Sequence, residues 1–267
     1  MTASLSDHEF GNFQRFIHDA AGITLGSAKK ALVSGRLAKR LQARGLASFN
    51  DYFKLLASGE DAAEVQTAVD LLTTNETYFF REPKHFELLR EVASAAPTGA
   101  PFRVWSAASS TGEEAYSIAM VLADTIGMSR PWEVVGSDIS SRVLARARVG
   151  HYPLERTRHI PQHYLKRFCL RGIDTQTGTL LVQRELRQRV SFTQVNLNTT
   201  LPQLGSFDMV FLRNVMIYFN GDTKRQVVAR VLGPLKRGGH FCIGHAETLN
   251  DICDAVVQVA PSIYRKP

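Results

Sequence analysis

The chain has 267 residues, of which 44% are hydrophobic and 21% charged, and its formal net charge is +7. This apolar content excludes a mainly disordered chain, and the length allows one large domain or two modest ones. No segment approaches the roughly 18 consecutive apolar residues of a membrane span, and the first ten residues lack a signal-peptide pattern. Three cysteines without CxxC spacing argue against a disulfide framework and a zinc site, so we expect a cytoplasmic protein without a bound metal.

Residues 1–72 have the pattern of a small helical domain. Apolar residues recur there at helical spacing in two segments, Phe10 to Ile17 and Leu32 to Leu41, and nothing alternates as a strand would. Residues 73–101 form the expected linker, which carries the sequence TTNETYFFREP and ends among helix breakers.

From residue 102 onward, apolar segments of strand length alternate with helical patterns. We expect strands near 102–107, 132–138, 190–197, 207–215 and 238–245, with a further short strand at IYRK, and helices near 112–126, 140–148 and 223–235. This alternation predicts an α/β domain with a parallel, doubly wound sheet over residues 102–267. Residues 160–190 do not fit a strand–helix unit, and we expect a small antiparallel β subdomain there.

The sequence VWSAASSTGEEAYS predicts a strand, a loop of small residues and a helix. Ala107, Ser109 and Gly112 occupy the three small positions of G-x-G-x-x-G spacing, which lets a backbone approach a ligand closely. Glu113 and Glu114 open the helix, where they would repel a phosphate and suit a cationic ligand. Helix capping by Thr111 and these acids is the alternative interpretation.

Two further strand ends carry polar side chains suited to a nucleoside. Asp138 ends the second expected strand, where a carboxylate accepts hydrogen bonds from ribose hydroxyls, and Asn196 lies at the end of the third, where an amide can meet an adenine edge. A nucleoside with a positive centre and no phosphates is S-adenosylmethionine, which we expect as the cofactor.

Five motifs in this order, TTNETYFFREPKHF, VWSAASSTGEEAYSIAM, SDIS, VNL and FLRNVMIYF, closely resemble the chemotaxis receptor glutamate methyltransferases, the CheR family. The resemblance covers nearly the whole chain. It implies an N-terminal helical domain for receptor recognition and a Rossmann-like S-adenosylmethionine methyltransferase domain with an inserted small antiparallel β subdomain. It also implies methyl esterification of specific glutamates on the cytoplasmic helices of chemoreceptors, which tunes adaptation.

Carried over residue by residue, the resemblance implies a set of cofactor contacts: Asn75, Thr77, Arg81, Glu114, Asp138, Asn196, Leu197, Arg213 and Asn214. It also places Arg81 and Tyr218 beside the methyl group and the incoming glutamate, as catalytic residues. The sequence departs from many relatives at Glu76 without touching these positions. Without the resemblance, Arg81 is also consistent with a surface ion-pair partner and Tyr218 with a core aromatic residue. His245 is interpreted as a structural histidine.

The implied reaction needs no general base. A receptor glutamate has an ordinary pKa of about 4.3 and is ionised at neutral pH. Catalysis then comes from alignment of carboxylate oxygen, methyl carbon and sulfur, and from a dry site. Arg81 would hold one carboxylate oxygen and Tyr218 would steer by a hydrogen bond.

Lys29, Arg36 and Arg40 fall within about 40° of one face of an ideal helix. We expect this face to bind acidic receptor helices, a solvated surface being the alternative. The β subdomain resembles the part that docks a receptor's C-terminal tail in some relatives. We expect a monomer without nucleic-acid partners or membrane insertion.

Two rival functions are weighed against this one. A nucleic-acid methyltransferase would use the same fold and the basic segments, but the Pro-Pro-aromatic run of base-methylating enzymes is absent after Asn214. A non-catalytic sensor of S-adenosylmethionine is the second rival, and the presence of Arg81 and Tyr218 argues against it.

Overall fold

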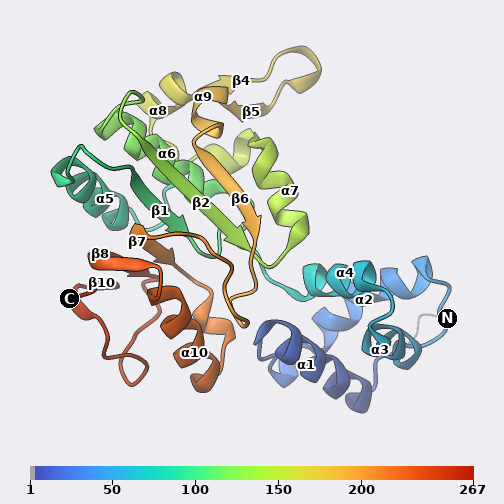
Figure 1. The fold of residues 1–267 in the computed structure, drawn as a ribbon. Coiled ribbons are helices and arrows are strands. Elements are labelled where there is room, and N and C mark those ends of the chain that lie inside the picture. The colour runs from blue at the N-terminus through green and yellow to red at the C-terminus, as the bar shows by residue number, and fades with distance from the viewer. Residues whose placement is uncertain (1–3) are drawn as a thin grey trace.

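The computed structural model describes residues 4–267 (Figure 1). Its N-terminal part is helical, as expected, and consists of α1 (Asp7–Ala21), the short 3-10 helix η1 (Ser27–Lys29), α2 (Lys30–Ala43), α3 (Phe49–Ser58) and α4 (Ala62–Leu72). The side chains of Ser6, Ser48 and Asp61 accept backbone N–H groups at the starts of α1, α3 and α4, which fixes where these helices begin. Residues 1–3, on which the expected domain start and the signal-peptide interpretation partly rest, lie outside the described residues.

A central sheet follows, with the strands β1 (Phe102–Ser106), β2 (Trp132–Asp138), β6 (Val190–Gln194), β7 (Phe207–Leu212), β8 (Leu235–Ile243), β9 (Val257–Ala260) and β10 (Ile263–Arg265). In the described chain their order is β6-β2-β1-β7-β8-β10-β9. The first five strands of this order pair in parallel, and β10 and β9 close the sheet as antiparallel strands. The parallel α/β sheet is therefore confirmed. The sequence pattern does not indicate β9.

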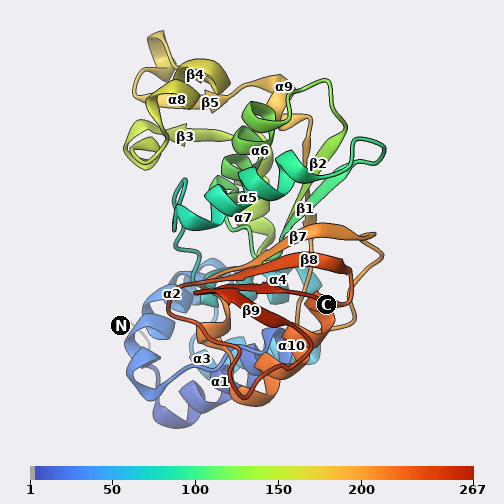
Figure 2. The ribbon, with the colours of Figure 1, turned by 90° about the vertical axis from the view of Figure 1, so that its left-hand side faces the viewer.

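Helices cover both faces of the sheet (Figures 1 and 2). They are α5 (Lys84–Ala95), α6 (Glu113–Thr125), α7 (Ser141–Val149) and α10 (Gly221–Leu232). Neighbouring strand residues point to opposite faces, so the sheet builds two cores. Val104 of β1 packs in the core that α5 and α6 cover, whereas Trp105 packs in the core that α10 and the helical domain share.

Helix α5 lies inside the expected linker of residues 73–101, where the sequence interpretation places no helix. Phe86, Leu89 and Ala93 recur at helical spacing and are buried, and Pro83 precedes the first turn. The helix packs against α6, so this segment belongs structurally with the sheet.

A second, small sheet is inserted between α7 and β6. Its strands β3 (His151–Pro153), β5 (Thr179–Val182) and β4 (Cys169–Arg171) pair antiparallel in that spatial order. Short helices accompany it, namely η2 (Leu154–Thr157), α8 (Gln162–Phe168), η3 (Asp174–Gln176) and α9 (Arg184–Arg187). The antiparallel insertion is confirmed, but it begins before residue 160, because β3 supplies one edge.

The helical domain packs against the carboxyl edge of the large sheet. Ile23 forms an isolated antiparallel bridge with Phe219, and the N–H of Thr24 donates to the carbonyl of Tyr218 over 2.8 Å. The small sheet lies at the opposite end of the molecule in both views (Figures 1 and 2). Over residues 4–267, no helix combines the length and the apolar character that crossing a bilayer requires.

Candidate active site

A cleft of about 900 Å³, measured to its open mouth, lies where the carboxyl ends of the parallel strands meet the helical domain. Its walls come from the end of α1, from residues 73–81 and from the segments that follow β1, β2, β6 and β7. All ten residues expected at the cofactor and catalytic positions line it: Asn75, Thr77, Arg81, Glu114, Asp138, Asn196, Leu197, Arg213, Asn214 and Tyr218. The structure brings these positions together, and their individual roles stay predictions.

The loop between β1 and α6 approaches the cleft with its backbone. Gly112 has φ 95°, and a Cβ there would lie 2.9 Å from the Ala147 methyl group, so a glycine is needed on both counts. Ser110 adopts φ 48°, and its hydroxyl donates to the Asn75 carbonyl over 2.9 Å. The loop of small residues therefore ties the Asn75 segment to the first strand.

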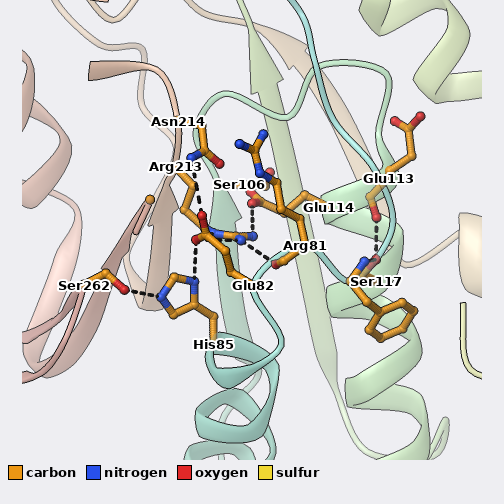
Figure 3. Close-up of polar contacts among 12 residues, drawn as sticks. Arg81, Glu82, His85, Ser106, Glu113, Glu114, Ser117, Arg213, Asn214 and Ser262 are labelled. Atoms are coloured by element: carbon orange, nitrogen blue, oxygen red, sulfur yellow. Dashed lines mark hydrogen bonds and ion pairs between the residues drawn. The ribbon is translucent and has the colours of Figure 1, made fainter. Parts of the chain in front are cut away.

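The two acids that open α6 point to different sides (Figure 3). Glu114 lines the cleft, where it accepts a hydrogen bond from Ser106 over 2.7 Å and pairs with Arg213 over 2.7 Å. Glu113 is fully buried and pairs with Arg156 over 2.6 Å. Burial raises the pKa of Glu113 above its ordinary value, although Thr111 and Arg156 oppose the shift. The geometry selects Glu114 as the cleft carboxylate.

Asp138, the last residue of β2, places its carboxylate in the cleft wall. Its oxygens accept the backbone N–H groups of Ser110 and Ser140, each over 2.9 Å. Burial raises the pKa of Asp138 to about 6, against the effect of these hydrogen bonds, and the nearby charge of Asp70 adds to the rise. The group is therefore a buried acceptor whose ionisation lies close to neutral pH.

Arg213 is held between two carboxylates (Figure 3). Its side chain is 2% exposed, and its N–H groups donate to Glu82, Glu114 and the carbonyl of Arg81. Burial opposes its charge, but Glu114 and Glu82 raise the pKa of Arg213 above the ordinary value. Arg213 thus uses most of its N–H groups on protein acceptors, which leaves few for a cofactor contact.

Asn196 and Asn214 are also engaged. The Asn196 amide donates to the Ala20 carbonyl over 2.7 Å and accepts from the Asn198 N–H over 2.9 Å, which fixes its orientation and leaves its second N–H for an adenine. Asn214 donates to Glu82 over 3.4 Å and has φ 57°. Tyr218 lies in the 3-10 helix η4 (Met216–Tyr218) and faces the cleft where α1 ends.

Arg81 is half-buried and reaches the cleft from an irregular segment. Its guanidinium lies 5.5 Å from the ring centre of Tyr78, and one N–H donates to the Glu76 carbonyl over 3.4 Å. Among the described residues no carboxylate pairs with the Arg81 side chain, so its charge is available to a ligand.

One cluster in the described chain has metal-ligand spacing: Glu82, His85 and His245, whose nearest ligand atoms lie within 4.8 Å of one another. Arg213 already donates to the Glu82 carboxylate, and its positive charge opposes a cation there. His85 is fully buried with a pKa lowered by burial to about 3, and it contacts Ser262 over 2.8 Å. We therefore assign the cluster to hydrogen bonding.

The structure places Lys29, Arg36 and Arg40, the residues expected to bind acidic receptor helices, in three different settings. Lys29 precedes α2 in η1, and Arg40 forms a bidentate ion pair with Glu64 at 2.5 and 2.9 Å. Arg36 donates to the carbonyls of Leu72 and Thr73. The acidic partner of Arg40 lies 24 residues along the chain, so the local pattern could not reveal it. A receptor-binding role of these residues stays a prediction.

Sequence reasoning missed three residues that hold the cleft. Glu82 accepts from Arg213, Arg156 donates to the Thr77 carbonyl over 3.2 Å, and Asp70 caps α7 from the helical domain. Glu82 adjoins Arg81 in the FFREP motif, which is a signal that could have identified it. The partners of Arg156 and Asp70 lie far away in sequence, and no local pattern indicates them.

Comparison with known proteins gives a consistent result. Residues 8–73 match the family described as CheR methyltransferase, all-alpha domain, and residues 75–263 match CheR methyltransferase, SAM binding domain. The chain is 41% identical over 253 residues to a chemotaxis protein methyltransferase of Escherichia coli (strain K12), covering 93% of this chain and 87% of that protein. It is 40% identical over 259 residues to chemotaxis protein methyltransferase 2 of Pseudomonas aeruginosa, covering 96% and 92%.

Proposed function

The chain belongs to the CheR methyltransferase family, and from this premise we propose that it esterifies specific glutamate side chains of chemoreceptors. The protein is an S-adenosylmethionine-dependent methyltransferase of chemotaxis. The proposal adds the acceptor, a carboxylate on an acidic receptor helix. The observation that carries it is the single cleft into which separate motifs bring Arg81, Tyr218 and the two carboxylates Glu114 and Asp138.

The carboxylates and the apolar residues of the cleft fit S-adenosylmethionine. Glu114 and Asp138 place negative charge where a phosphate would be repelled and a sulfonium or ammonium attracted. Asp138 offers oxygens to ribose hydroxyls, and Leu197 adds an apolar wall. The loop at Ser110 and Gly112 lets the backbone come close.

S-adenosylmethionine supplies an electrophilic methyl group on a positively charged sulfur. The receptor carboxylate forms the new oxygen–carbon bond as the sulfur–carbon bond breaks, and that electron pair returns to sulfur. No proton moves, so the cleft needs no general base. Arg81 holds one carboxylate oxygen, and Tyr218 orients the other by donating a hydrogen bond. A bound receptor helix that covers the cleft would exclude water and so favour a reaction in which opposite charges neutralise each other.

The charge around the cleft mouth suits an acidic partner. Arg36 lies near both Tyr218 and Arg142, and burial together with the Arg142 charge lowers the pKa of Arg36 below its ordinary value. An approaching receptor carboxylate would relieve this repulsion. We propose that Lys29 of η1 and Arg36 and Arg40 of α2 face the receptor, although Arg40 is paired with Glu64. We also propose the small sheet as a docking place for a receptor tail.

The test is methyl transfer from labelled S-adenosylmethionine to the cytoplasmic fragment of a chemoreceptor, with nucleic acid as a second acceptor. Glutamate methyl esters hydrolyse in mild alkali, whereas methyl groups on nitrogen do not. We expect alkali-labile label on receptor glutamates, formed much more slowly but still measurably by Arg81→Ala, and at a reduced rate by Tyr218→Phe. Label on nucleic acid, or tight cofactor binding without any transfer, would establish one of the two rival functions.

A further inference from the structure

One carboxylate joins the segments of Arg81, Arg213 and His245, of which the first two line the cleft. Glu82 accepts from Nε and Nη2 of Arg213 over 3.2 and 2.9 Å, from the Asn214 amide over 3.4 Å and from the His245 backbone N–H over 3.1 Å. The side chain of Glu82 is 10% exposed, so water does not compete strongly for these bonds. Figure 3 shows the carboxylate between Arg213, Asn214 and His85.

The backbone around Arg81 is strained on both sides. Phe80 has φ 56° and Glu82 has φ 58°, a left-handed conformation that non-glycine residues adopt only when their surroundings enforce it. The Phe80 N–H donates to Ser117 over 3.0 Å, and the Arg81 carbonyl accepts from Arg213. Arg213 also donates two hydrogen bonds to Glu82. The Glu82 carboxylate therefore helps to fix the turn that carries Arg81.

Glu82 does not line the cleft, whereas Arg81, Arg213 and Asn214 do. We propose that Glu82 is a positioning residue for methyl transfer: its carboxylate fixes Arg213 and the strained turn, and thereby the direction in which Arg81 enters the cleft. This inference rests on the proposed function, because it assigns Glu82 an effect on the step that Arg81 serves. The Glu82 carboxylate accepts from Arg213, Asn214 and the His245 N–H, and not from Asn75, Asp138 or Asn196, so we expect the cofactor contacts of these three residues to survive its substitution.

The test is a double-mutant cycle between Glu82→Gln and Arg81→Ala, read by kcat for receptor methylation and by cofactor affinity. Glu82→Gln keeps the shape and removes the charge. We expect kcat to fall by about 100-fold, because displacement of a positioned group by about 1 Å has an effect of this order. In the Arg81→Ala background the same substitution should change kcat by no more than about twofold, while S-adenosylmethionine affinity stays within that range.

Glu247→Gln is the matched control. Its carboxylate accepts from the N–H groups of Gly244, Asn214 and Met216, so it holds the same loops without touching Arg213 or Arg81. We expect its effect to be equal in both backgrounds. Glu82→Asp, which keeps the charge, should recover part of the lost kcat, and the cycle is repeated with it if Glu82→Gln does not fold.

The outcomes separate this inference from the proposed function. Wild-type protein that methylates receptor glutamates while both Glu82 variants match its kcat leaves the function intact and refutes the inference. The same holds if Glu82 and Arg81 substitutions act additively, because Glu82 would then be a general structural residue. Wild-type protein that does not methylate the receptor refutes the proposed function and this inference with it.

Discussion

Asp138 is a buried acid that titrates close to neutral pH, and we expect this to control cofactor affinity. Burial raises its pKa to about 6. Ribose hydroxyls donate hydrogen bonds to the ionised carboxylate, and protonation removes that acceptor. Lowering the pH from about 7.5 to about 5 should therefore weaken S-adenosylmethionine binding, measured by calorimetry. Asp138→Asn should cost roughly 1.5–3 kcal/mol at neutral pH, the range of charge-assisted hydrogen bonds.

The variant also supplies the control for the pH effect. In Asp138→Asn the residual affinity should vary little over the same range, since the titrating group is gone. An equally steep pH dependence in both proteins would assign the effect to another group and contradict the ribose role of Asp138. For stability the sign is opposite: a folded-state pKa above the ordinary value of 3.8 means that Asp138 destabilises the fold increasingly as pH rises from about 4 to above 6.

At the residue scale, the sequence predicted which side chains meet but not which are already engaged. The family resemblance supplied ten residues that all line the cleft, and the residue pattern alone indicated Glu114, Asp138 and Asn196. Neither indicated that Arg213 is shared between Glu82 and Glu114, which lie 131 and 99 residues away along the chain. Ion pairs of this kind arise from the tertiary fold, and no local period encodes them. The same limit explains why the pairing of Arg40 with Glu64 was not predicted.

At the scale of elements, strands and helices with strong apolar patterns were predicted nearly to their ends, such as β2. Helix α5 was missed although its apolar residues have helical spacing. The polar motif before it was interpreted as part of a linker, and this interpretation was extended over the helix. The start of the small sheet was missed because β3 has only three residues, too few to show an alternation. Its pairing with β5 depends on contacts across the insertion.

The small sheet contacts the segments around Thr77 and Thr111, which adjoin the cleft. We therefore expect that removing these contacts weakens cofactor binding. Arg156 of η2 pairs with the buried Glu113 and donates to the Thr77 carbonyl, and Tyr152 of β3 donates to the Thr111 carbonyl over 2.7 Å. Arg156→Met leaves Glu113 as a buried carboxylate without its cation. We expect unfolding free energy to drop by about 3–5 kcal/mol at most, with weaker cofactor binding.

The measurements are urea unfolding and calorimetric titration with S-adenosylhomocysteine. The control is Arg156→Met combined with Glu113→Gln, which removes both charges and should recover much of the stability. Equal stability of Arg156→Met and the wild type would mean that Glu113 is hydrated or protonated when Arg156 is absent. The ion pair would then not be what couples the small sheet to the cleft.

At the scale of the whole molecule, the sequence predicted two domains but not how they dock. The helical domain shares one continuous core with the sheet, and its last helix reaches the cofactor edge. Asp70 of α4 accepts the N–H groups of Ser141 and Arg142, the first two residues of α7, over 3.0 and 3.2 Å, and the Ser141 hydroxyl over 2.8 Å. A carboxylate from one domain thus caps a helix of the other.

We expect this cap to stabilise the docked arrangement and, through it, the cofactor edge. Asp70→Ala leaves two N–H groups at the start of α7 without their acceptor, so unfolding free energy should fall by about 1–3 kcal/mol. Ser141→Ala removes only the hydroxyl contact, and the double variant should lose less than the sum of the single losses, since both act on one bond. Urea unfolding of the four proteins measures this coupling.

Cofactor affinity distinguishes a local cap from a coupling between domains. Asp70 does not line the cleft, yet its charge lies close enough to Asp138 to raise the pKa of that carboxyl. Asp70→Asn should therefore move the pH at which S-adenosylmethionine binding weakens to a lower value, because Asp138 then ionises more readily. An unchanged pH dependence would show that the helical domain caps α7 without influencing the cofactor site. A shift would mean that docking of the helical domain and cofactor binding are linked.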